Sequence, residues 1–202
     1  MARPKNSPEK IEKMRNDMMD AVIDLLDEVA PEKVSIRMIA DKIGVSHMVF
    51  YTYFKDRSEI MKALIERQSR RIEKHFEGLI EKARREPVKS VLMGLLTDYT
   101  TTAVEHPKIF RMFWMTDRVV KKGSINKFEH MEPLFEKLAE LLQLGMEKGE
   151  FVQRNARLAA VTVLSSINSP IILNICGKMP TGITCDELLG EIKSEILAYL
   201  TS

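Results

Sequence analysis

A run of basic, hydroxyl and aromatic residues between positions 35 and 57 is the part of this chain best suited to recognise a nucleic acid. Arginine, lysine and hydroxyl groups contact phosphate oxygens, and neighbouring side chains read the edges of the bases. The residues expected on phosphates are Arg37, Ser46, Tyr51, Lys55 and Arg57. The residues expected nearest the bases are His47, Met48 and Thr52. The chemistry predicted here is therefore non-covalent recognition of a polyanion.

Two short helices around a tight turn would position these side chains. Ser35 is the expected N-cap of the first helix, and Gly44 is the residue type that usually follows a helix C-terminus. Ser46 is the expected N-cap of the second helix, with Phe50 and Phe54 packed in the core beneath it. Two short helices joined in this way form a helix-turn-helix.

Longer helices flank this motif. Apolar residues recur every three to four positions over residues 9–29, which predicts an amphipathic helix that Pro31 terminates. Asp56, with Glu59 three residues later, resembles a capping box and predicts a long charged helix over residues 57–84. This second helix would connect the DNA-binding part to the rest of the chain.

The charge is distributed unevenly although the net charge is only +2. Residues 1–15 and 33–57 each carry five basic and two acidic side chains. Between them Asp17, Asp20, Asp24 and Asp27 recur on one face of the first helix, where we expect them to be simply solvated. Two basic segments on one face, with the acids turned away, would orient the N-terminal part toward a polyanion.

The rest of the chain also has helical periodicity and no strand signal. Further helices are expected over residues 88–104, 108–119, 125–147, 156–176 and 186–200. The predicted fold class is therefore all-α.

Residues 21–65 resemble the TetR family of regulators. The likeness rests on Ile39-Ala40, on Gly44-Val45-Ser46, and on the aromatic, basic and acidic run Phe50 to Ile60. Met48 stands where a glycine is common and Tyr53 where a histidine is common, so Tyr53 joins the candidate DNA-binding residues. The resemblance implies about nine helices, a DNA-binding domain over residues 1–57, and a ligand-binding and dimerisation domain over residues 58–202.

An aromatic and apolar group is the candidate site for a small-molecule effector. Its members are Met93, Tyr99, Phe110, Phe113, Trp114 and Asn168. Ordinary core packing is the alternative for each apolar member, whereas a buried Asn168 would need a polar partner that a ligand can supply. The group predicts a mainly apolar or aromatic effector.

The last two helices are the candidate dimer interface. Residues 158–175 are apolar on more than one face, and residues 188–200 carry a second apolar stripe, so the pair could form a four-helix contact across a two-fold axis. Packing within one chain is the alternative. A palindromic DNA target favours the homodimer.

Several function classes lack support in the sequence. No apolar run is long enough to span a membrane and the N-terminus does not read as a signal peptide, so we expect a cytoplasmic protein. Cys176 and Cys185 have no metal-ligand spacing and are expected to be free thiols. Because no nucleophile motif or phosphate-binding loop is present, we expect neither catalysis, a metal nor a cofactor.

The sequence therefore predicts a ligand-responsive repressor that a small effector releases from a palindromic operator. Two alternatives remain: a DNA-binding dimer with no ligand, and a helical interaction protein.

Overall fold

The computed structural model describes residues 7–115 and 131–202, which contain nine α-helices and one short 3-10 helix. These residues divide into two compact units. The head unit comprises the described residues up to Gln68 together with residues 106–115, and the body unit comprises residues 69–105 and 131–202. The all-α prediction is confirmed. Parts of two expected helices, residues 116–119 and 125–130, lie outside the described residues.

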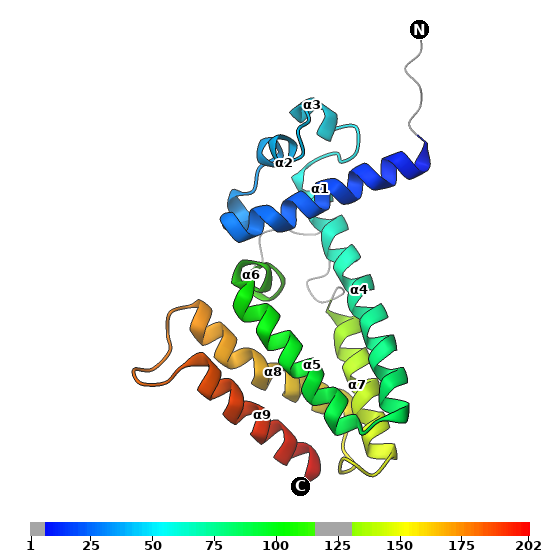
Figure 1. Cartoon of the computed structure of the whole chain (residues 1–202), viewed down its shortest axis with the longest axis vertical. Helices are drawn as coiled ribbons and strands as arrows, with labels where there is room; N and C mark the ends of the chain where they lie inside the picture. Colours follow the sequence, from blue (N-terminus) through cyan, green and yellow to red (C-terminus); the bar gives the residue numbers. More distant parts are fainter. Residues whose placement is uncertain (1–6, 116–130) are drawn as a thin grey trace. The chain divides into compact units, whose positions relative to one another are not determined.

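The head unit consists of four helices and the beginning of a fifth. They are α1 (Pro8–Glu28), α2 (Ile36–Lys42), α3 (His47–Phe50), the start of α4 (Arg57–Arg85) and α6 (Pro107–Met115), with the 3-10 helix at Pro31–Lys33. In Figure 1, α2 and α3 lie above α1 and α6 lies below it. Helix α1 packs against α2 and α6, and α3 packs against α2.

The predicted helix boundaries of the motif have clear local causes. The Ser35 side chain accepts a hydrogen bond from the Met38 backbone N–H at 3.2 Å, which caps α2. Gly44 has a φ of 70°, the left-handed conformation that glycine adopts without steric cost. The turn between α2 and α3 is therefore fixed by its sequence, as expected.

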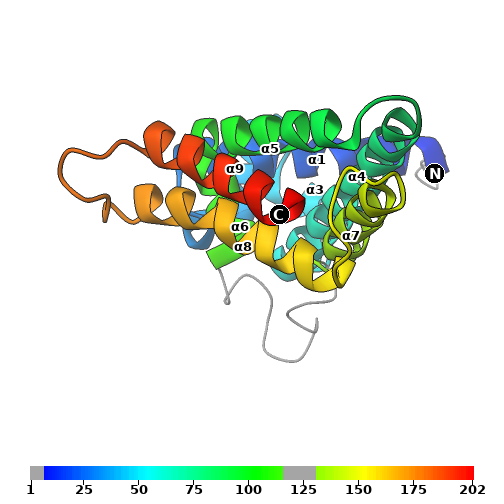
Figure 2. The same cartoon turned by 90° about the horizontal axis from the view of Figure 1, so that it is seen from below.

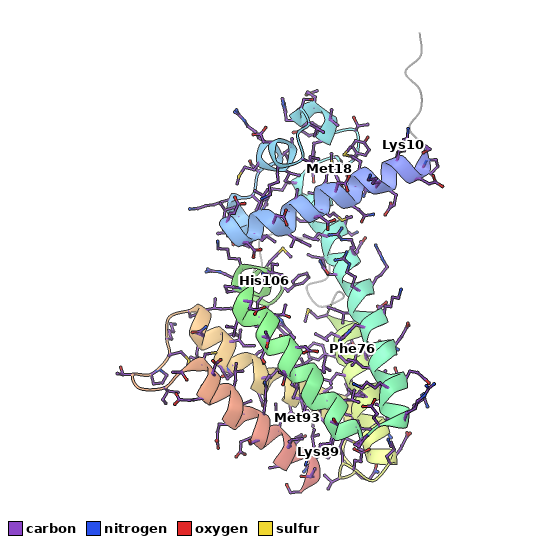
Figure 3. All side chains as sticks on the ribbon, viewed as in Figure 1. Lys10, Met18, Phe76, Lys89, Met93 and His106 are labelled. Carbon is purple, nitrogen blue, oxygen red and sulfur yellow. The ribbon has the colours of Figure 1, made fainter. Side chains whose placement is uncertain are left out.

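The head core is apolar and draws on every helix of the unit. Met18 in the middle of α1 (Figure 3), Phe50 of α3, Phe54 between α3 and α4, and Leu64 of α4 are fully or almost fully buried in one cluster. Met112 of α6 belongs to the same cluster. The helix-turn-helix thus rests on a core that α6 helps to complete, although α6 lies far from it in sequence.

The body unit contains the remainder of α4, α5 (Val88–Glu105), α7 (Glu132–Glu147), α8 (Ala156–Ile175) and α9 (Cys185–Thr201). The central helix is α8, which packs against α5, α7 and α9. Figures 1 and 2 show α8 and α9 running side by side in opposite directions. The caps agree with these bounds, because Asn155 begins α8 and a capping box of Thr184 and Glu187 begins α9.

Among the described residues, α8 alone is long and apolar enough for a membrane span by length and composition. Its packing against three helices explains this composition, since buried side chains such as Val163, Ile167 and Ile171 need apolar surroundings on several sides. The helix is therefore a core element of the body unit.

A polar joint connects α4 and α5 within the body unit. The Lys148 ammonium donates to the carbonyls of Ala83 and Glu86 at 2.9 and 2.7 Å, at the C-terminus of α4. The Glu150 carboxylate accepts from the Lys89 backbone N–H at 3.0 Å, at the start of α5. A cation at a helix C-terminus and an anion at a helix N-terminus both interact favourably with the helix dipole. The loop Lys148-Gly149-Glu150 thus fastens two helix ends.

Candidate nucleic-acid interface

The predicted base-reading residues are exposed on α3 and the turn that follows it. His47, Met48 and Thr52 are accessible, and Met48 retains 64% of its surface. Phe50, between them in sequence, is completely buried and packs its ring 5.7 Å from that of Phe54. One buried aromatic anchor therefore holds a small set of exposed side chains on a short helix.

Ser46 lies at the N-cap position of α3, as predicted, but its hydroxyl makes no capping hydrogen bond. Its side chain is exposed beside His47 and is not used to satisfy the helix. A serine in this state can donate to a phosphate oxygen without breaking a local bond. The exposed hydroxyl of Tyr51, half of whose surface is accessible, has the same chemical capacity.

Two of the predicted phosphate-binding cations are exposed. Arg37 lies 3.7 Å from Asp41 in an ion pair whose side chains are both largely in solvent, and such a pair costs little to break. The Lys55 side chain is also exposed, while its backbone N–H donates to Glu59 at 2.6 Å. Both ammonium and guanidinium groups are therefore available for phosphates.

Arg57 and Tyr53 are placed differently because both have bonds within the head unit. The Arg57 Nε donates to the Val34 carbonyl at 2.7 Å, and its Nη2 donates to the Pro31 carbonyl. The Tyr53 carbonyl accepts a hydrogen bond from Arg15. These contacts fix the entry to α2 and the exit from α3. Contact of either residue with DNA stays a prediction.

Two of the four aspartates on α1 have partners, which corrects the expectation that all four are merely solvated. Asp20 pairs with Arg67 at 2.8 Å, and Asp27 lies 3.2 Å from the His106 ring. The Lys108 ammonium also donates to the Asp27 carbonyl at the end of α1. These residues come together because α4 and α6 pack on α1. The spacing of the aspartates along the sequence cannot predict this packing.

Arg67 is a buried cation that the sequence analysis missed. Its guanidinium contacts the Asn16 carbonyl and side chain at 3.3 Å as well as Asp20, while its Nε has no partner. The sequence spacing indicates that Arg67 is buried, because Ile60, Leu64 and Arg67 follow one another at intervals of four and three along one face of α4. A polar residue in an apolar register predicts a buried partner.

Three of the predicted effector-binding residues belong to the body unit. Met93 and Tyr99 are half-buried on α5, with Met93 labelled in Figure 3, and Asn168 of α8 is 4% exposed. The Tyr99 hydroxyl donates to Asn168 Oδ1 at 2.5 Å. Among the described residues, no hydrogen bond uses the two N–H donors of the Asn168 amide. The amide therefore retains donor capacity inside the body.

The other three, Phe110, Phe113 and Trp114, belong to α6 of the head unit. Phe110 is buried and stacks on Trp114 with ring centroids 6.1 Å apart, whereas Phe113 packs against the head core. The prediction that these residues share one pocket with Met93, Tyr99 and Asn168 stays a prediction.

Within the described residues, no group of three His, Cys, Asp or Glu side chains is arranged to hold a metal ion. Cys176 is exposed, and Cys185 is partly buried with its Sγ 3.8 Å from the Pro170 carbonyl. Burial and the nearby Asp186 carboxylate raise the pKa of the Cys185 thiol, which lowers its reactivity.

The sequence of the head matches a known family. Residues 19–64 match the model for bacterial regulatory proteins of the tetR family. This range includes α2, α3 and the exposed residues described above. The head therefore carries a sequence typical of the DNA-binding part of bacterial regulatory proteins of the tetR family. No curated protein matches the chain by sequence.

Solved structures share the fold over most of the chain. FadR from Bacillus subtilis, in complex with stearoyl-CoA, superimposes with a TM-score of 0.70 at 15% identity over 92% of this chain and 98% of that one. RolR, in complex with resorcinol, gives 0.66 at 18% identity over 96% and 91%. A TetR/AcrR-family regulator from Thermobifida fusca gives 0.62 at 19% identity over 92% and 97%. The fold prediction is thereby confirmed.

Proposed function

We propose that this protein is a repressor that binds a palindromic operator as a homodimer and leaves it when a small, largely apolar or aromatic effector binds. The proposal of operator binding is supported by a set of exposed residues around the buried Phe50 anchor. These are Ser46, His47, Met48, Tyr51 and Thr52. In this arrangement side chains enter a major groove while the core beneath them stays closed.

The effector proposal is supported by the hydrogen bond between the half-buried Tyr99 and the buried Asn168. The Asn168 side chain is 4% exposed and its amide N–H groups make no described hydrogen bond, so they are available to a ligand. A ligand with an apolar or aromatic body and one hydrogen-bond acceptor would supply a partner for them. Resorcinol, the ligand in the RolR structure, has an aromatic ring, and stearoyl-CoA, in complex with FadR of Bacillus subtilis, has a long acyl chain.

The homodimer proposal is supported by the outer faces of α8 and α9. Leu158 and Val161 on α8 are 63% and 39% exposed in the single chain. Leu188 and Ile192 on α9 are only partly buried, four positions apart on one face. A second copy packed on these faces would remove the apolar side chains from water.

The regulatory step follows from linkage between two binding equilibria. Two recognition helices must lie about 34 to 36 Å apart to enter successive major grooves of one operator. An effector that binds only dimers with another spacing lowers operator affinity, and operator lowers effector affinity by the same factor. Because α4 is one continuous helix from Arg57 to Arg85 that contributes to both units, it is the proposed transmitter.

The decisive test is selection of duplexes from random DNA, followed by a salt titration of the best one. A palindromic sequence bound at nanomolar concentration with a steep salt slope supports the repressor. In that assay, Lys55→Gln is expected to lower the slope by about one, as the loss of one phosphate contact requires. Equal affinity for all duplexes would refute operator recognition.

The effector part needs a separate measurement on the same protein. Resorcinol and a long-chain acyl-CoA serve as probes, and each is tested for thermal stabilisation and for release of the selected duplex. Asn168→Ala is expected to abolish the response, whereas Asn174→Ala, an exposed amide on the same helix, leaves it intact. Strong DNA binding with no response to any apolar or aromatic probe would favour the DNA-binding dimer without a ligand.

A further inference from the structure

Arg15 of α1 contacts the chain at the point where the recognition helix ends. Its Nη1 donates a hydrogen bond to the Tyr53 carbonyl and lies 3.6 Å from the Glu59 carboxylate. The guanidinium carbon also lies 4.0 Å from the centroid of the Phe54 ring. Only 26% of the Arg15 side chain is exposed. One side chain of α1 therefore contacts the three residues that lead from α3 into α4.

These contacts matter because α3 cannot support itself. It has four helical residues, followed by turn bonds from the Tyr53 and Phe54 N–H groups to the Phe50 carbonyl at 2.9 and 3.0 Å. A single helical turn is unstable in isolation because the ordering of its backbone outweighs the few hydrogen bonds it gains. Three residues after the helix ends, the Tyr53 carbonyl is satisfied by Arg15.

The Phe54 contact links Arg15 to the anchor of α3. Phe54 is buried, and its ring packs on Phe50, which is the completely buried residue of α3. A guanidinium over an aromatic face is attracted by the electron-rich face of the ring, most strongly when the pair is shielded from water. The stacking and the hydrogen bond to Tyr53 act on the same short segment, so together they limit both its position and its rotation.

The Glu59 contact joins this segment to the beginning of α4. The Glu59 carboxylate faces Arg15 and also accepts the Lys55 backbone N–H at 2.6 Å. Its own backbone N–H donates to the Asp56 side chain at 3.0 Å. The guanidinium of Arg15 is therefore occupied by protein groups on two sides, an arrangement suited to holding the turn and poorly suited to reaching a phosphate.

We propose that Arg15 is a positioning residue that sets the orientation of the recognition helix α3 and does not bind DNA itself. In the sequence, Arg15 is only one of the five basic residues of the N-terminal segment. The positioning role is a more specific one, and it rests on the DNA-binding function of the head. The inference predicts a loss of sequence discrimination, rather than a general loss of attraction to DNA, when the guanidinium is removed.

The DNA test compares Arg15→Gln with Lys13→Gln, an exposed lysine on the same helix with the same charge change. The probes are the duplex selected by the wild-type protein and a random-sequence duplex of equal length, titrated over a range of salt. Arg15→Gln is expected to weaken binding to the selected duplex about ten-fold relative to Lys13→Gln, with equal salt slopes and equal affinity for the random duplex.

Arg15→Lys separates geometry from charge, because lysine keeps the positive charge and loses the planar fork. We expect it to resemble Arg15→Gln. The proposal is wrong if Arg15→Lys restores wild-type affinity, or if Arg15→Gln weakens both duplexes equally with a salt slope lower by about one, which is the signature of a lost phosphate contact.

Amide hydrogen exchange on the DNA-free protein tests the same role independently. In Arg15→Gln the Tyr53 and Phe54 amides are expected to exchange at least about ten-fold faster, while amides of the α1 core such as Leu25 stay protected, which also shows that the variant is folded. Unchanged exchange at Tyr53 and Phe54 would overturn the proposal whatever the DNA assay gives. Failure of the wild-type protein to prefer any duplex would instead refute operator recognition, with the exchange result still deciding Arg15.

Discussion

The head unit and the body unit are each stabilised internally by a different kind of contact. In the head, two helices of seven and four residues depend on side chains from distant elements that bond to their backbone, such as Arg15 on Tyr53 and Arg57 on Val34. In the body, helices of 16 to 20 residues pack along their lengths, and polar side chains act mainly at helix ends. Short helices need such polar bracing, whereas long ones are stabilised by apolar contact.

This difference explains why the head has a recognisable sequence and the body does not. A bond from a side chain to one carbonyl tolerates few replacements, but an apolar core accepts many sequences of similar volume. The family match accordingly covers residues 19–64, while structures with related bodies share only 15 to 19% of their residues with this chain. Four predictions test the contrast, from the largest expected effect to the smallest.

Removal of the aromatic anchor in the head should have the largest effect. Phe50→Ala is expected to destabilise the protein by about 3–5 kcal/mol, because it leaves a cavity beneath α3. Urea unfolding measures the loss. Met48→Ala, two residues earlier in the same helix and largely exposed, is the control and should change stability by less than about 0.5 kcal/mol. Similar losses from both would contradict the idea that one residue anchors α3.

Tight packing in the body predicts the next effect. A Cβ at Gly145 would lie 2.2 Å from Phe151 Cδ2, and the Phe151 ring is buried. Gly145→Ala should therefore cost about 1–3 kcal/mol. Gly94→Ala in α5 meets nothing within 4 Å and should be neutral or stabilise by up to about 1 kcal/mol, since alanine favours helix. If thermal unfolding gave the two variants the same midpoint, the body would be packed more loosely than described.

Loss of the hydrogen bond between Tyr99 and Asn168 in the body should have the third-largest effect. Tyr99→Phe removes the donor to Asn168 and should cost about 1–2 kcal/mol, because it leaves a buried carbonyl oxygen without a partner. Tyr199→Phe removes a hydroxyl of α9 that makes no described hydrogen bond, so it should be nearly silent in the same unfolding assay. An effector that contacts the Asn168 amide should recover part of the Tyr99→Phe loss.

The smallest expected effect depends on pH. Burial raises the pKa of the Glu150 carboxyl, but hydrogen bonds from the Lys89 and Val88 N–H groups and from Lys148 outweigh it and lower the pKa below its usual 4.5. A lowered pKa means that the charged form stabilises the fold above the unfolded pKa, and that this contribution is lost as pH falls through the folded value.

Glu150→Gln should therefore cost about 0.5–1 kcal/mol at neutral pH, in the range of a helix cap, and almost nothing at acid pH below the folded pKa. Glu191→Gln, an exposed glutamate of α9, should differ little from wild type at any pH. Urea titrations at several pH values measure both. A constant difference between Glu150→Gln and wild type across this range would show that charge is not the cause.

Much of the fold was predictable because its signals are local. Ser35, Gly44 and Pro31 mark helix ends through their own backbone chemistry, and the apolar period defines the helices. The partners of Asp20 and Asp27 were not predictable, since they depend on which helices pack on α1. For the same reason the bonds of Arg15 and Arg57 to distant carbonyls have no signature in sequence spacing. The exposure of Ser46, His47 and Met48 follows from the amphipathic pattern, whereas the partial burial of Tyr53 and Arg57 depends on long-range packing. Contacts of all these residues with DNA require an operator.

The place of α6 in the head core has a consequence for synthesis on the ribosome. The head is built from two stretches of chain, and Met112 with its neighbours Ile109 and Phe113 arrives only after residues 69–105 have been made. Nascent domains fold as units once their sequence is complete. The helix-turn-helix therefore emerges first yet completes its core late, and a nascent chain released before α6 would carry the recognition residues on an unfinished support.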